Sequence, residues 1–407
     1  MFRAMAVDCS VILLSYSISS GALESHDVLV SYSSITLALH NTIILMITLT
    51  YIFLLQQHRY GDVSAFLIQN FDFLLGQYSE IVTLAPQQLT QDVINNVKAV
   101  EGKLTWLMQI IAACIGTPGM SGVSVDLKKN QTELLSDGNL CRLGFRLVEL
   151  IDTRMNSTQG QSKCDVKLEL AVLQFFKNFK KVYMNDHHSS TSSTYNGSIS
   201  VPGRSAAHPL LRSALSAPID REDQEDKENV DIYGAIGQGV DVNFIMKVMI
   251  EKLCNNVKFW QSSDKVLDET LEVFVDFVSN YHSSKTLLGL DTVNFMVTQH
   301  TGEFFPFLGY DNDNKHRTTF YSALSRLVFS SSEDLNNCFD QFIQPNLDIL
   351  AQLTSLPDDQ FTQAPTRCAI VGALRDLRGI AVSAYSRRTY ALLFDALYVN
   401  RESYKED

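Results

Sequence analysis

Proline is scarce in this sequence, with only 9 in 407 residues. Because proline breaks helices and marks the turns of β-rich folds, its scarcity favours long uninterrupted helices over a β-sandwich. The chain also lacks an excess of basic charge, since its formal net charge is −12. Nucleic-acid binding requires a clustered basic surface, so we expect no nucleic-acid partner. An acidic scaffold of this kind is better suited to basic protein partners.

The signatures of common catalytic and metal sites are missing as well. The sequence contains no P-loop, no GxSxG and no HExxH motif. Its seven cysteines include no CxxC pair, which favours buried, reduced thiols in a cytosolic or nuclear protein. The one paired histidine, His187-His188, has no cysteine or carboxylate partner at ligand spacing. We therefore predict that the protein is not an enzyme and binds no cofactor and no metal.

The first 57 residues differ in composition from the rest. No charged residue occurs from Val28 to Gln57, and residues 36–55 are mostly apolar and long enough to span a bilayer. Three hypotheses follow. These residues are a transmembrane helix, or a signal peptide, which Asp8 disfavours, or an unrelated N-terminal extension over 1–57 that does not dock on the rest. The abrupt change of composition at His58 favours the extension.

Beyond residue 58 the dominant hydrophobic period is helical. One such stripe, which places apolar side chains on a single helix face, consists of Val242, Ile245, Met249, Leu253, Val257 and Trp260. A second stripe begins at Leu267, after a short break that ends at Asp264, the expected N-cap. So short a connection makes the two helices antiparallel neighbours. Residues 242–260 and 264–281 are therefore predicted to form a helical hairpin.

The same periodicity predicts a series of helices along the chain. They cover residues 62–83, 88–115, 140–150, 168–182, 291–300, 315–329, 335–353, 364–384 and 388–398. Helix pairs that recur about every forty residues are typical of HEAT repeats. We predict an all-α fold, an α-solenoid of HEAT-like (ARM-type) helical hairpins; a compact helical bundle is the alternative. The domains expected are repeats over 58–184 and 236–400, a disordered Ser-rich and acidic loop over 185–235, and a tail over 401–407.

Several segments, in a fixed order, carry a resemblance to a known family. They are Glu101-Gly-Lys-Leu-Thr-Trp-Leu107, Lys167-Leu-Glu-Leu-Ala-Val-Leu173, His300-Thr-Gly-Glu-Phe-Phe-Pro-Phe-Leu-Gly309, Arg317-Thr-Thr-Phe-Tyr-Ser-Ala-Leu324 and the most specific, Gly372-Ala-Leu-Arg-Asp-Leu-Arg-Gly-Ile-Ala381. Together, from roughly His58 to Tyr398, they resemble the middle of the exportin-7/Ran-binding protein 17 family in the importin-β superfamily.

The resemblance implies a non-catalytic nuclear transport receptor. Receptors of this kind are curved HEAT solenoids that hold protein cargo and the Ran GTPase on the concave surface and couple the two affinities. The implied partners also include nuclear pore components, and the implied location is the nucleus, the cytoplasm and the pore. Family members are much longer than this chain. We therefore expect a central fragment that lacks the N-terminal repeats that grip Ran and the C-terminal arch, and whose uncapped ends self-associate.

The alternative function is a membrane-anchored helical-repeat adaptor, in which residues 36–55 span the bilayer and the repeats face the cytosol. The candidate interaction residues are Arg375, Asp376 and Arg378. The two arginines, on an inner face, would meet an acidic loop or a cargo, or all three residues would organise the packing between neighbouring repeats through paired charges. The second interpretation is favoured. Trp106 and Trp260 are likewise predicted to be core residues.

Overall fold

The computed structural model describes residues 61–83, 91–116, 127–181, 242–279, 284, 286–310, 312–331 and 335–403, with side chains left aside at 127–135, 242–243 and 399–403. The predicted extension over 1–57, the candidate membrane segment over 36–55 and the loop over 185–235 lie outside these residues. The chain divides into two units, Met1–Arg59 and Tyr60–Asp407, and all described residues belong to the second.

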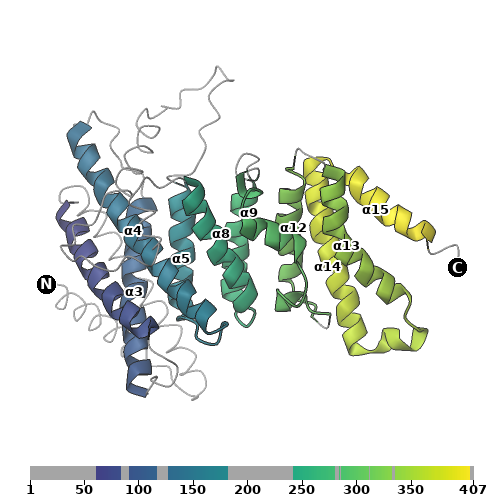
Figure 1. Cartoon of the computed structure of the whole chain (residues 1–407), viewed down its shortest axis with the longest axis horizontal. Coiled ribbons are helices and arrows are strands. Elements are labelled where there is room, and N and C mark those ends of the chain that lie inside the picture. The colour runs from purple at the N-terminus through teal and green to yellow at the C-terminus, as the bar shows by residue number, and fades with distance from the viewer. Residues whose placement is uncertain are drawn as a thin grey trace, which may run out of the picture. The chain divides into compact units, whose positions relative to one another are not determined.

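Every regular element in the described part of the chain is a helix (Figure 1). The first helix covers residues 61–82. It is followed by α3 (Gln91–Gly116), α4 (Leu127–Ser157), α5 (Val166–Phe179), α8 (Val242–Phe259), α9 (Asp264–Ser279), α11 (Asp291–Thr298), α12 (His316–Val328), α13 (Leu335–Thr354), α14 (Ala364–Arg387) and α15 (Tyr390–Ser403). Two short 3-10 helices, η3 (Pro306–Leu308) and η4 (Asp358–Thr362), precede α12 and α14. These bounds confirm the all-α prediction.

The helices stack in two layers, which confirms the α-solenoid. In the first layer α3 packs on α5, α5 on α9, α9 on α12, and α12 on α14. In the second layer α4 packs on α8, α8 on α11, α11 on α13, and α13 on α15. Contacts between α3 and α4, α8 and α9, and α14 and α15 join the two layers. Because each helix pair meets its neighbours on either side, the array continues from α4 and α5 to α8 and α9.

The helical hairpin predicted over residues 242–281 is confirmed, because α8 and α9 contact each other. One detail of that prediction was wrong: Asp264 is the first residue of α9 and not its N-cap. An acidic residue in the first turn still interacts favourably with the helix dipole. Phe274 and Phe277 on the inward face of α9 are completely buried, as the apolar stripe predicts.

Helix α5 shows how sequence positions a helix in this array. Asp165 caps it, since the carboxylate accepts a 2.7 Å hydrogen bond from the backbone N–H of Lys167. Phe175 and Phe179 of α5 meet Phe145 of α4 edge-on, with ring centroids 5.3 and 5.1 Å apart. Burying each large apolar side chain contributes roughly 1.5–3 kcal/mol, so these contacts fix α5 against the second layer.

The two tryptophans differ in their environments. Trp260 is 3% exposed, which confirms its predicted core position. The same prediction for Trp106 was wrong, because 42% of its surface is exposed. The buried face of α3 carries Leu104 and Met108, and Trp106 lies midway between them in sequence. A residue two positions along an α-helix points to the opposite side, so Trp106 faces outward.

Candidate functional site

A groove of about 750 Å³ lies between α3 and the segment that joins α4 to α5. Its lining from α3 includes Ile94, Val97 and Lys98, and the joining segment contributes Lys163 and Asp165. Lys98 is exposed and Lys163 half-buried, so both ammonium groups lie at the rim. Apolar surface between cationic side chains is suited to holding a polypeptide segment, and it offers no arrangement of an acid, a base and a nucleophile.

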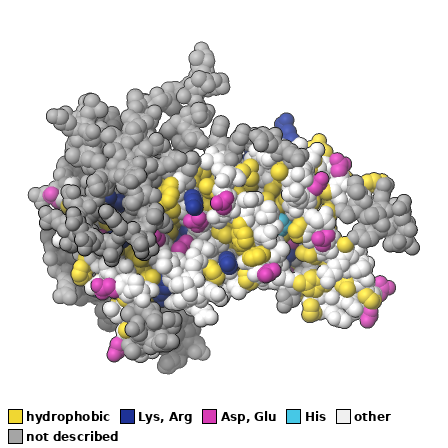
Figure 2. All heavy atoms as spheres, viewed as in Figure 1, with side chains coloured by type: hydrophobic (Ala, Val, Ile, Leu, Met, Phe, Trp, Pro, Cys, Tyr) yellow, Lys and Arg dark blue, Asp and Glu magenta, His cyan; other side chains and the backbone are white. Residues whose placement is uncertain are grey.

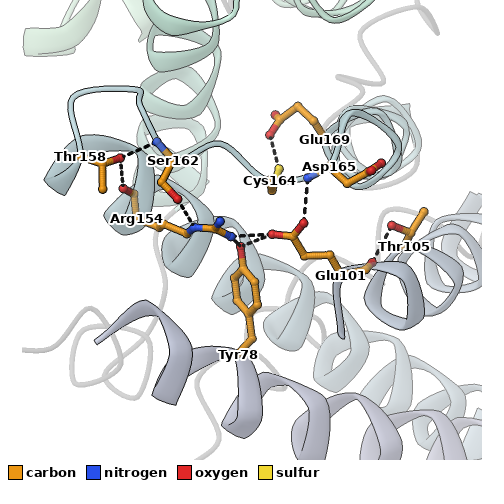
Figure 3. A network of polar contacts seen from close by, with 9 residues as sticks. All are labelled: Tyr78, Glu101, Thr105, Arg154, Thr158, Ser162, Cys164, Asp165 and Glu169. Atoms are coloured by element: carbon orange, nitrogen blue, oxygen red, sulfur yellow. Dashed lines mark hydrogen bonds and ion pairs between the residues drawn. The ribbon is translucent and has the colours of Figure 1, made fainter. Parts of the chain in front are cut away.

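A polar network beneath this groove joins four elements (Figure 3). Arg154 of α4 donates through Nη1 to Glu101 Oε1 of α3 at 2.6 Å and to the hydroxyl of Tyr78 at 3.0 Å. The other carboxylate oxygen, Glu101 Oε2, accepts a 3.0 Å bond from the backbone N–H of Asp165. Arg154 Nε donates to Ser162 Oγ at 2.8 Å. The network therefore fixes the joining segment on the first helix, α3 and α4.

Burial determines the electrostatics of this network. It raises the pKa of Glu101, although the Arg154 guanidinium opposes the shift. It also raises the pKa of Tyr78, to which the neighbouring Glu101 carboxylate adds. Burial alone would lower the pKa of Arg154, but Tyr78 and Glu101 outweigh it and leave that pKa raised. Each charge on the groove floor has a partner, which leaves Lys98 and Lys163 to set the charge offered at the rim.

A second network lies where α8 meets α4 and α5. Lys252 of α8, with no exposed surface, lies 2.9 Å from Glu169 Oε2 and 3.0 Å from Asp152 Oδ1. Asn256 donates to Glu169 Oε1 at 2.6 Å. Although burial lowers the pKa of Lys252, the two carboxylates outweigh it and raise that pKa above its usual value. A charged lysine in this position holds the helices before and after residues 182–241 together.

The structure places the three predicted site residues in different environments on α14. Asp376 is completely buried and pairs with Arg317 of α12, through Nε to Oδ1 at 2.8 Å and Nη2 to Oδ2 at 2.5 Å. Burial raises the pKa of Asp376 against the opposing effect of Arg317. Arg375 is half-buried and Arg378 is exposed. The partner of Asp376 is thus neither of its neighbouring arginines but a residue 59 positions away.

Two glycines on α14 allow this ion pair to form. A Cβ on Gly372 would lie 3.0 Å from the guanidinium carbon of Arg317. A Cβ on Gly379 would lie 2.4 Å from the backbone oxygen of Thr318 and 3.0 Å from the backbone nitrogen of Ser322. Only glycine permits so close an approach of two helix backbones. Sequence reasoning missed Arg317, Lys252 and Glu169, although Arg317 and Glu169 both stand inside the motifs that carry the family resemblance.

Neither a metal site nor a membrane span is found in the part of the chain that the structure describes. No group of three or more histidine, cysteine, aspartate or glutamate side chains comes together there in a way that could hold a metal ion. No described helix is both long and apolar enough to cross a membrane. The candidate span over 36–55 lies outside that part.

The family model described as "Exportin-7-like, TPR domain" matches residues 30–316, which is more than half of the chain. The match begins before His58 and includes residues 36–55, and the segment Gly372–Ala381 lies beyond its end. The description names TPR repeats where the sequence suggested HEAT-like repeats; in both types, helix pairs stack into a solenoid.

Curated relatives are similar over most of this chain. Exportin-7-B of Xenopus laevis and Ran-binding protein 17 of Mus musculus are each 28% identical over 84% of the chain, and Exportin-7 of Dictyostelium discoideum is 25% identical over 74%. The chain spans 27%, 27% and 26% of the length of these relatives. No solved structure matches. Since the family model covers more than half of its residues, the chain belongs to the exportin-7-like family.

Proposed function

We propose that this chain is a cargo-binding section of a nuclear transport receptor that acts in Ran-dependent protein export. The observation that carries the proposal is the match of the exportin-7-like model to residues 30–316. The relatives similar to this chain are named exportins or Ran-binding proteins, which supports protein cargo and Ran as partners. Transit between nucleus and cytoplasm would also require contact with pore components.

A binding role without catalysis is supported by how the chain uses its buried charges. Lys252, Arg154 and Arg317 each join one helix to another, and none of them faces an open cleft together with a nucleophile. Figure 2 shows hydrophobic and charged side chains intermixed on the viewed face of the described residues. Such a mixed surface resembles a protein–protein interface more than an active site.

We also propose roles for the residues singled out above. Asp376 organises the packing between neighbouring repeats, which its burial against Arg317 supports. Lys98 and Lys163 at the rim of the groove between α3 and α5 would meet acidic groups of a bound protein. Residues 30–57 would belong to the repeat array, because the family match includes them. That assignment disfavours the membrane-anchored adaptor, whose span would need residues 36–55.

A pull-down of the full chain with Ran tests this proposal. Ran loaded with a non-hydrolysable GTP analogue should be retained, and Ran loaded with GDP serves as the matched control. Expression in cells followed by carbonate extraction should leave the chain in the soluble fraction. Equal or absent binding of both Ran forms, together with carbonate-resistant pelleting, would refute the transport role in favour of the adaptor.

A further inference from the structure

Helix α14 has a first-layer neighbour on one side only. In that layer α5, α9 and α12 each pack between two helices, whereas α14 packs against α12 alone among the described residues. Its α12-facing side is the one that carries Gly372, Asp376 and Gly379. The opposite side is where the next first-layer helix would lie if the two layers continued.

That opposite side is apolar and open. Along α14, residues at spacings of three and four form a stripe whose apolar members are Val371, Leu374, Val382 and Tyr385, and Tyr385 is 81% exposed. Helix α15, which packs on α14, adds Tyr390, Phe394 and Tyr398, with Phe394 73% exposed. We call these seven residues the α14–α15 face. Large aromatic side chains are rarely left in water on two adjacent helices, and such patches mark interaction surfaces.

The junctions inside the first layer show what kind of partner this face is suited to. Between α5 and α9, Lys177 pairs with Glu269 at 2.6 Å and with Glu272 at 2.8 Å. Between α9 and α12, Lys315 pairs with Asp268 at 3.1 Å, and between α12 and α14, Arg317 pairs with Asp376. Each junction thus combines an apolar stripe with at least one cation–carboxylate bridge between the two helices.

On the α14–α15 face the cation is present and its partner is not. Arg378 is exposed and lies one turn from Leu374 and one turn from Val382, in the middle of the stripe. No carboxylate among the described residues pairs with it. A partner helix with an apolar stripe and one acidic side chain opposite Arg378 would repeat the pattern of the other junctions.

A second copy of the chain fits this face less well. In a two-fold dimer with α14 antiparallel to its copy, the central Arg378 of one chain would meet the Arg378 of the other. Like charges placed opposite each other in an interface are destabilising.

We propose that the α14–α15 face binds a helical hairpin of exportin-7-like sequence supplied by a second polypeptide, which extends both layers and places a carboxylate against Arg378. The proposal rests on continuity with the α12–α14 and α13–α15 contacts and does not depend on Ran binding. The relatives supply a probe, because this chain spans only 27% of Exportin-7-B of Xenopus laevis.

The test combines the full chain with the region of Exportin-7-B of Xenopus laevis that directly follows the aligned part. Co-expression and light scattering should give a one-to-one complex. The double variant Tyr385→Asp/Phe394→Asp should weaken binding at least ~30-fold, as expected for central aromatic contacts, and Arg378→Glu about tenfold. The matched control is Phe66→Asp/Phe73→Asp on the first helix, since Phe66 and Phe73 are 63% and 66% exposed. It should bind as the original chain does.

Three outcomes would overturn the proposal. One is no complex with the probe while circular dichroism shows the chain folded. Another is a complex that the α14–α15 variants do not weaken. The third is a dimer of the chain that the same variants dissociate, because the occupant would then be a second copy.

Discussion

Replacing Gly379 with alanine should force α12 and α14 apart. The new Cβ would lie 2.4 Å from the backbone oxygen of Thr318, and ordinary contact begins at 3.4 Å, so the two backbones must separate by about 1 Å. Because the obstacle is backbone, no side-chain rotation relieves it. The same movement would stretch the bonds of Arg317 to Asp376 and of Ser383 to Ser322, which lie in the same junction.

The magnitude follows from two opposing effects. Overpacking a well-packed interface costs about 1–3 kcal/mol, and weakening a buried ion pair adds to that cost. Alanine in a helix interior gains about 1 kcal/mol over glycine. We expect Gly379→Ala to lower the free energy of unfolding by about 2 kcal/mol. Gly102→Ala in α3 is the matched control, since nothing lies within 4 Å of its Cβ position, and it should stabilise by up to about 1 kcal/mol.

Urea denaturation followed by circular dichroism measures both variants. Amide hydrogen exchange should show faster opening of α12 and α14 in Gly379→Ala and no change there in Gly102→Ala. If Gly379→Ala were as stable as the control, the two backbones could not be as close as the structure places them.

Three further predictions concern buried residues. Lys252→Met leaves the buried Glu169 carboxylate without its cation, so the free energy of unfolding should fall by about 3–5 kcal/mol, and adding Glu169→Gln should restore part of it; an unchanged urea midpoint would contradict the ion pair. Burial lowers the pKa of His300 from 6.5 to about 4, so the unfolded chain binds more protons in that window and stability falls as pH drops through it, by up to about 3 kcal/mol. His300→Leu should therefore lose less thermal stability between about pH 7 and about pH 4.5 than the original chain, and an equal loss would rule this out. Phe274→Ala should cost about 3–5 kcal/mol in chemical denaturation, because the ring is completely buried; a change below about 1 kcal/mol would show an outer position.

Periodicity alone was sufficient to predict the helices. The spacing of apolar side chains follows directly from 3.6 residues per turn, so the stripe from Val242 to Trp260 and the short break at Asp264 were enough to predict the hairpin of α8 and α9. The absence of catalytic motifs and the ordered segments of family sequence were also visible without coordinates. Helix ends were less certain, as Asp264 shows, because capping depends on local backbone geometry.

Only the tertiary structure decided which charged residues meet. Arg317 and Asp376 are 59 positions apart and Lys252 and Glu169 are 83 apart, and no local pattern reveals such pairs. Periodicity assigns a residue to a face of its own helix but does not say which helix covers that face. The sequence drew attention to Arg375, Asp376 and Arg378 as a group; stacking against α12 buried Asp376 and left Arg378 exposed on the opposite side, because consecutive helical positions point in different directions.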